Sequence, residues 1–314
     1  MNSKENSSLL SDLKLYGALS RTPHGLLELA IPGLAALLCL GGLPSPYVIA
    51  LGLVTALAGY TSVYALNDLV DYHADRERIR QAGFMDTEIF VESGLIRHPV
   101  AQGQLSFKQG LTWCLFWAVI ALVGAWLLNP VCAFIFLGGA FLEAVYCLLL
   151  RVSPIRTLVH GVVKTSGAMA AVFAVSPEPP VPFLAALFFW IFFWEIGGQN
   201  IPADWHDIEE DKVLHARTVP LLFGPRKAGF WVSSALATSV ILSLIVLWSA
   251  PGRPSLFYFG LILVLGLYLL IWPAFRLLGD PSRTRTGALF SRATYYPPAV
   301  FLVLGFDIIS RFGG

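Results

Sequence analysis

The chain has 314 residues, of which 56% are hydrophobic and only 13% charged, with a formal net charge of +1 and a mean hydropathy of +0.69. Soluble domains carry about 25% charged residues, so the composition excludes a disordered chain and an ordinary water-soluble globule and indicates a polytopic membrane protein. The near-zero net charge provides no basic field for nucleic acid. The four cysteines lie in apolar runs without a CxxC pair, which disfavours a disulfide framework or a zinc site.

Residues 1–24 are polar, and we expect them to form a cytoplasmic amino-terminal segment rather than a cleavable signal. Residues 25–314 read as one membrane domain. Crossing the hydrocarbon core takes about 20 apolar residues per helix. We therefore predict an all-α, multi-pass protein with about nine transmembrane helices, over roughly residues 25–43, 47–66, 107–128, 130–150, 158–176, 181–201, 228–250, 255–278 and 294–311.

The basic residues divide unevenly between the two sides of this predicted bundle. Of the 21 Lys and Arg, 19 fall on the side of the amino-terminus, and only Arg253 and Arg311 fall on the other. Cytoplasmic loops carry an excess of Lys and Arg. The sequence therefore predicts that the amino-terminus and the long loops 67–107, 202–227 and 279–293 face the cytoplasm.

A first acidic cluster follows the second predicted helix, in the run NDLVDYHADRER. If that helix continues, Asn67, Asp71 and Asp75 are spaced i, i+4 and i+8 and share one face, which Asp68 borders. Stacked carboxylates repel one another and need a compensating cation. We call Asn67, Asp68, Asp71 and Asp75 the first motif.

A second acidic cluster follows the sixth predicted helix, in the run DWHDIEEDK. Asp204, Asp207 and Asp211, the second motif, again share one helical face, whereas Glu209 and Glu210 are expected to point elsewhere. Two oxygen-only faces suit Mg²⁺, which shares its coordination shell with water and substrate phosphates. The alternatives are a pair of solvated acidic loops, or an ion pathway, which would favour isolated ionisable groups at mid-membrane depth.

The two motifs resemble the aspartate-rich motifs NDxxDxxxD and DxxDxxxD of the UbiA superfamily of intramembrane prenyltransferases. RHPVAQG, at 97–103, resembles the segment that follows the first motif in that superfamily, except that His98 stands between the Arg and the Pro. TVPLLFG, at 218–224, resembles the segment after the second motif. The resemblance covers about residues 20–310 and implies a helical bundle around a central cavity.

The resemblance also implies a reaction. Two Mg²⁺ ions, bridged by the diphosphate of a polyprenyl diphosphate, help that group to leave, and a small acceptor captures the allylic carbocation. An aromatic acceptor is expected, as in quinone biosynthesis. A non-aromatic acceptor or a terpene cyclisation is possible on the same fold, and a cation-coupled transporter is the alternative from another class. The implied metal ligands are Asn67, Asp68, Asp71, Asp75, Asp204, Asp207 and Asp211, and the implied catalytic residues are Asp71, Asp75, Asp207 and Asp211.

The substrate-binding candidates are Asn67, Arg21, Tyr146, Arg151, Lys164, Glu195, Gln199 and Asn200. Arg151 comes one residue later than the cation of the family's YxxxK pattern, so Arg156 is an alternative phosphate contact. Lys164 lies about two turns inside a spanning helix, where an ammonium is costly unless paired, and we expect it to face the diphosphate or an acidic motif. Glu195 and Glu143 are candidates to bind the acceptor or take its proton. The stretch 76–96 is longer than expected at this point, and it is either a cytoplasmic amphipathic helix at the cavity mouth or an inert insertion.

Overall fold

The computed structural model describes residues 13–82, 95–251 and 253–312, and all regular structure in these segments is helical. Nine of the described helices are long and apolar enough to cross a membrane, which confirms the predicted fold class. These spans cover Thr22–Leu40, Pro46–Val70, Phe107–Leu128, Pro130–Leu148, Arg156–Val175, Val181–His206, Val219–Ser249, Leu256–Gly279 and Arg283–Arg311.

Several spans consist of more than one helical segment. From residue 22 onward, the helical segments inside and between the spans are α2 (Thr22–Glu28), α3 (Ala30–Leu40), α4 (Pro46–Val70), α5 (Tyr72–Ala82), α6 (Phe107–Leu128), α7 (Pro130–Leu148), α8 (Arg156–Val175), α9 (Val181–Glu195), η1 (Ile196–Asn200), α10 (Ile201–His206), α11 (Ile208–Val213), α12 (Val219–Ser249), α13 (Leu256–Gly266), η2 (Leu267–Ile271), α14 (Trp272–Gly279), α15 (Arg283–Thr294) and α16 (Tyr296–Phe312). The predicted amphipathic helix over 76–96 coincides with the end of α5 as far as Ala82, and its residues 83–94 lie outside the described part of the chain.

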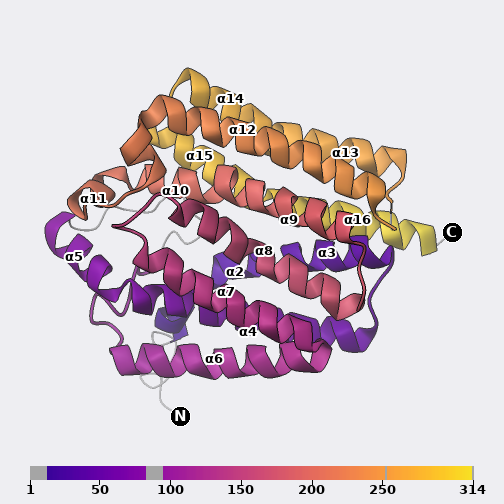
Figure 1. The fold of residues 1–314 in the computed structure, drawn as a ribbon, viewed down its shortest axis with the longest axis horizontal. Helices are drawn as coiled ribbons and strands as arrows, with labels where there is room; N and C mark the ends of the chain where they lie inside the picture. Colours follow the sequence, from indigo (N-terminus) through magenta and orange to yellow (C-terminus); the bar gives the residue numbers. More distant parts are fainter. Residues whose placement is uncertain (1–12, 83–94, 252, 313–314) are drawn as a thin grey trace, which may run out of the picture.

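The helices run side by side along the bundle (Figure 1). Neighbouring spans pack in chain order through α6, α7, α8 and α9, and α3 contacts both α8 and α16, so the first span meets the last. Short polar caps fix where the spans begin. Asn129 accepts a hydrogen bond from the Val131 amide at the start of α7, immediately before Pro130.

The largest core lies between α9, α12 and α16, where Trp190, Trp194 and Tyr296 are almost fully buried. Large apolar side chains such as Phe134 and Phe141 on α7 instead point outward, with 67% and 69% of their surface exposed. Outward-facing Phe of this kind is expected where the solvent is lipid.

Both acidic motifs lie at one end of the bundle, where α5 and α11 pack together (Figure 1). The predicted continuous helical faces are wrong in detail. α4 ends at Val70 and α5 begins at Tyr72, so Asp71 stands between two helices, with φ −81° and ψ 0°. Asp207 stands between α10 and α11 in the same way, with φ −91° and ψ 15°. This sparsely populated backbone region often holds active-site residues.

A π-helical turn, η1, precedes the second motif. A Cβ on Gly197 would lie 2.9 Å from the Val232 carbonyl oxygen, and one on Gly198 would lie 2.9 Å from the Ala293 Cβ. These two glycines therefore let η1 approach α12 and α15 closely. Such turns are frequent at functional sites, and this one directs Gln199 and Asn200 inward.

Candidate active site

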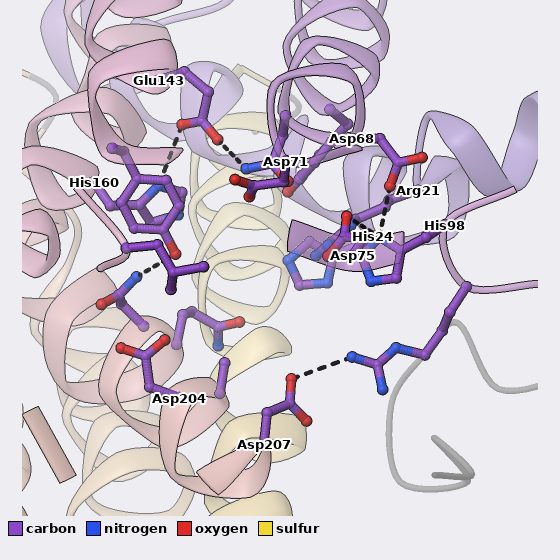
Figure 2. A pocket seen from close by; sticks show the side chains of 18 of the residues that line it. Arg21, His24, Asp68, Asp71, Asp75, His98, Glu143, His160, Asp204 and Asp207 are labelled. Carbon is purple, nitrogen blue, oxygen red and sulfur yellow. Dashed lines mark hydrogen bonds and ion pairs between the residues drawn. The ribbon is translucent and has the colours of Figure 1, made fainter. Parts of the chain in front are cut away.

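A polar pocket of about 190 Å³ opens where the two motifs meet, and all seven motif residues line it. First-motif residues and His98 occupy one side, and Asp204 and Asp207 occupy the other (Figure 2). The motifs are more than 120 residues apart in the chain, so the packing of α5 on α11 is what brings them together.

The first motif is held by residues from two other segments. The Asn67 side-chain amide donates to Glu143 Oε1 at 2.6 Å. His98 Nδ1 lies 2.7 Å from Asp68 Oδ1 and 2.9 Å from Asp75 Oδ2, so one imidazole joins two carboxylates. His98 has a left-handed φ of 50°, which turns its side chain back toward α4 and α5.

The second motif is held by arginines. Arg156 Nη1 donates to Asp204 Oδ1 at 3.0 Å, and Arg97 Nη2 donates to Asp207 Oδ2 at 3.3 Å. Arg97 also donates to Glu210 at 3.2 Å. Glu210 is 2% exposed, so the prediction that it points elsewhere is wrong. Glu209 does point outward, where it pairs with Lys212.

One guanidinium connects the two motifs. Arg78 on α5 lies 3.5 Å from Asp75 Oδ1, 3.2 Å from Asp211 Oδ1 and 3.6 Å from Glu210 Oε2. Only 13% of its side chain is exposed. Arg78 therefore neutralises part of the facing negative charge.

The remaining charge perturbs the pKa values at this end of the bundle. Burial and the charge of Asp75 raise the pKa of Asp71 to about 6. Burial and the charge of Asp204 likewise raise the pKa of Asp211. Burial opposes the charged form of His98, but Asp75 and Asp68 outweigh it and raise the pKa of His98 to about 9. The two carboxylates therefore favour the imidazolium form of His98.

The donor set fits divalent cations. The oxygen atoms Asp68 Oδ2, Asp204 Oδ2, Asp207 Oδ1 and Asp211 Oδ2 are buried without a hydrogen-bond partner among the described residues. Buried carboxylate oxygens without a partner are costly. Carboxylates from the two facing motifs offer hard oxygen ligands of the kind that Mg²⁺ requires.

A basic stripe on α8 was not predicted as a unit. Arg156, His160 and Lys164 are spaced i, i+4 and i+8 and all line the pocket. His160 lies between two buried carboxylates, with Nδ1 3.3 Å from Glu143 Oε2 and Nε2 3.3 Å from Glu195 Oε1. The spacing of the three basic residues in the sequence was the signal that could have found this stripe.

Lys164 pairs with a carboxylate outside both acidic motifs. Its ammonium pairs with the Glu28 carboxylate and donates to the Tyr64 hydroxyl at 2.7 Å, and Tyr64 donates to Glu28 Oε2 at 2.7 Å. His24 Nε2 is 3.2 Å from Glu28 Oε1. Lys164 therefore faces the cavity, as predicted, but its charge is met by Glu28 rather than by an acidic motif.

Arg151 lies outside the pocket. Its side chain is 46% exposed and pairs with Glu77 on α5. Arg156, the alternative, lies inside the pocket and covers the Tyr146 ring at 4.1 Å from its centroid. The turn that follows Leu148 directs Arg151 away from the cavity. The chain turns back toward the cavity at Arg156, the first residue of α8.

The other candidates also line the pocket. Arg21 has a left-handed φ of 43°, and its guanidinium lies 5.8 Å from the Tyr64 ring centroid. Asn200 donates to the Tyr146 hydroxyl at 3.3 Å. Gln199 accepts from Thr294 and donates to the Phe290 carbonyl oxygen, both at 3.3 Å, so it also fastens η1 to α15.

A second, apolar cavity of about 780 Å³ begins where the polar pocket ends. It is lined by α3, α4, α7, α8 and α16, and it shares Tyr64, Glu143, His160 and Lys164 with the polar pocket. A ligand with an anionic head and a long apolar tail fits this succession of environments.

The fold and pocket together define an integral-membrane helical enzyme with a paired-carboxylate site above an apolar cavity. The model of the UbiA prenyltransferase family matches residues 29–296. The chain belongs to this family and is a prenyltransferase, as the motif resemblance predicted.

Individual relatives are named for different reactions. The chain is 29% identical over 240 residues to protoheme IX farnesyltransferase from Desulforudis audaxviator, covering 73% of this chain and 72% of the relative. It is 26% identical to digeranylgeranylglyceryl phosphate synthase from Methanococcoides burtonii, over 65% and 72%. A UbiA homologue from Archaeoglobus fulgidus, solved with GPP and Mg²⁺, superposes with a TM-score of 0.64 at 20% identity, over 92% of this chain and 99% of that one.

Proposed function

We propose that the protein transfers a prenyl group from a polyprenyl diphosphate to a small acceptor that carries a hydroxyl group, an aromatic one as in quinone biosynthesis. The observation that carries this proposal is the meeting of both carboxylate motifs in one polar pocket that continues into a large apolar cavity. In this proposal the diphosphate would lie between the two motifs, and the prenyl chain would extend into the apolar cavity.

The residues of both motifs have the same proposed task. Asn67, Asp68, Asp71, Asp75, Asp204, Asp207 and Asp211 would hold Mg²⁺, two ions in all. These ions supply charge neutralisation for the departing diphosphate. Arg78 and Arg156 lie beside the same carboxylates and are placed to bind phosphate oxygens, because guanidinium groups grip phosphate bidentately. As the C–O bond of the donor breaks, its electron pair leaves with the diphosphate.

The acceptor is placed at the junction of the two cavities. Two buried carboxylates, Glu143 and Glu195, flank the single imidazole of His160 there. Since Lys164 is already balanced by Glu28, this junction favours a neutral hydrogen-bond donor over an anionic headgroup. After the new bond forms, a proton leaves the acceptor, and Glu143 or Glu195 is placed to take it.

Turnover in a defined bilayer tests the proposal. Purified protein in nanodiscs would receive geranyl diphosphate and Mg²⁺ with one acceptor at a time: 4-hydroxybenzoate, a neutral hydroquinone, a glycerol phosphate lipid or protoheme. We expect Mg²⁺-dependent diphosphate release and a prenylated phenolic product, measured by mass spectrometry. Release with none of the acceptors prenylated would contradict the acceptor class, and no release at all would contradict the proposed donor.

The orientation of the protein is part of the proposal. Because 19 of the 21 basic residues fall on the motif side, both motifs should face the cytoplasm. A single cysteine at the exposed position Glu209, in a variant without the four native cysteines, should react with an impermeant maleimide only in inverted vesicles. Labelling of that cysteine in intact cells would overturn the orientation.

A further inference from the structure

His98 is the one place where the RHPVAQG segment departs from the pattern that it resembles, and the structure puts its side chain inside the first motif. Its Nδ1 is the atom that lies 2.7 Å from Asp68 Oδ1 and 2.9 Å from Asp75 Oδ2. These three ligand atoms lie within 4.8 Å of one another. Figure 2 shows the imidazole turned toward both carboxylates.

The backbone around His98 is fixed on both sides. Arg97, the preceding residue, is anchored to Asp207 and Glu210 on the opposite side of the pocket. After it, the Gln102 amide donates to the His98 carbonyl oxygen at 3.0 Å, and Val100 is buried in a small core cluster. The anchored backbone therefore holds the imidazole in the pocket, where the His98 side chain is 9% exposed.

One further atom indicates that a ligand is expected here. Asp68 is only 6% exposed. Its Oδ2 atom is buried and has no hydrogen-bond partner among the described residues. A buried carboxylate oxygen without a partner is costly. We therefore expect Asp68 Oδ2 to bind a ligand in addition to the contact that Asp68 makes with His98.

From this arrangement we propose that His98 is a nitrogen ligand of the divalent cation at the first motif, together with Asp68 and Asp75. The inference rests on the proposed function only in that a cation occupies this motif. It distinguishes the two motifs, because no histidine is found with Asp204, Asp207 and Asp211 in such a group among the described residues.

A nitrogen ligand changes which ion the site favours. Mg²⁺ prefers oxygen ligands, whereas imidazole suits first-row transition metals, whose affinity for mixed sites rises from Mn²⁺ onward. The first motif should therefore bind Mn²⁺ in preference to Mg²⁺, while the second motif keeps the oxygen-only preference for Mg²⁺. The competing possibility is that imidazolium only replaces the cation in its absence and moves away when the ion binds.

Pulsed EPR separates these two possibilities without turnover. The full-length protein, stripped of metal, would be loaded with Mn²⁺ and inorganic diphosphate, and electron spin echo modulation would be recorded. We expect the coupling of a directly coordinated ¹⁴N, replaced by a ¹⁵N coupling in protein labelled with [¹⁵N]histidine. Bound Mn²⁺ without such a coupling overturns the proposal, as does a failure of Mn²⁺ to bind.

Two variants assign the nitrogen to this residue. His98→Gln should abolish the coupling and weaken Mn²⁺ binding by at least about tenfold, with a smaller change for Mg²⁺. His73→Gln is the matched control, because His73 is exposed on α5 two residues from Asp75 and should keep both the coupling and the affinity. A coupling that persists in His98→Gln overturns the assignment.

If His98→Gln does not fold, the spectrum of the ¹⁵N-labelled wild-type protein still decides whether a histidine is coordinated. Mg²⁺-dependent diphosphate release, measured in parallel, keeps the inference separate from the proposed function. Release without a nitrogen coupling would leave the function standing and reject His98 as a ligand. Absence of both would reject both.

Discussion

The two acidic motifs share one backbone design but differ in their counter-ions. In each, the middle aspartate stands at a break between two helices, Asp71 between α4 and α5 and Asp207 between α10 and α11. Besides Arg78, which contacts both motifs, the first motif is joined to an imidazole, His98, whereas the second is joined to the guanidinium groups of Arg97 and Arg156.

The comparison shows how the same carboxylate spacing can serve unlike tasks. Arginines stay charged at any accessible pH and do not coordinate metal, so they suit phosphate oxygens. Histidine both titrates and coordinates metal. We therefore propose that both motifs bind an ion and that their unlike counter-ions adapt them to different ligands.

The largest effect should come from removing either middle aspartate. Asp71→Asn or Asp207→Asn should reduce diphosphate release by about a thousandfold or more, because losing a metal ligand costs several kcal/mol of transition-state stabilisation. Release of diphosphate from geranyl diphosphate at saturating Mg²⁺ measures this effect. Glu209→Gln, two residues from Asp207 but exposed, is the control and should be normal. Near-normal turnover in either aspartate variant would show that the two motifs are not equivalent.

Much of this site was accessible from the sequence, because its clues were local. Apolar length determines the spans, and the helical spacing of the two acidic clusters, together with their resemblance to the family's motifs, singled out the seven motif residues. The helix breaks at Asp71 and Asp207 were not accessible, since either residue is compatible with a continuing helix. The sequence also could not predict that Lys164 pairs with Glu28 or that Arg78 pairs with Glu210. Those pairs depend on packing between segments more than 100 residues apart.

The second-largest effect should come from removing Arg78, whose guanidinium joins the two motifs. Arg78→Met leaves Asp75, Asp211 and Glu210 without their shared cation, and breaking a buried pair costs about 3–5 kcal/mol. We expect a lower melting temperature in chelator, largely restored by Mg²⁺, because a divalent cation replaces the lost charge. The exposed Arg76 on the same helix provides the control, Arg76→Met. An equal loss in both variants would reject the bridging role.

The Lys164–Glu28 pair sets a stability effect against a kinetic one. Lys164→Met and Glu28→Gln should each destabilise the protein by about 3–5 kcal/mol, because each leaves one buried charge. The double variant should lose less than the sum of the two. Thermal unfolding of all four proteins completes the cycle. A phosphate contact would instead lower donor kcat/KM by roughly 10- to 150-fold in Lys164→Met, with little change in stability.

The His98 imidazole predicts a pH dependence for the metal-free protein. Its folded pKa of about 9 lies above the ordinary 6.5, so its stabilising effect is complete below pH 6.5 and is lost as the pH rises to about 9. The shift corresponds to a stability change on the order of 3 kcal/mol. In chelator, the melting temperature of the wild-type protein should fall across this window, and that of His98→Gln should fall less. Parallel curves would contradict the assignment of the titrating group.

The smallest effect should come from Arg151, which the sequence placed beside the substrate and the structure places outside the pocket. Its pair with Glu77 is exposed on both sides, and such pairs contribute little because water and salt screen them. Arg151→Gln should therefore change donor kcat/KM by less than about twofold. Arg156→Gln, at the start of α8, is the comparison: it removes a buried guanidinium beside Asp204, and the loss of a charged hydrogen bond to phosphate is worth roughly 10- to 150-fold. If Arg151→Gln proved the more damaging of the two, the diphosphate would have to extend beyond the pocket toward α5, and the second motif would no longer be its centre.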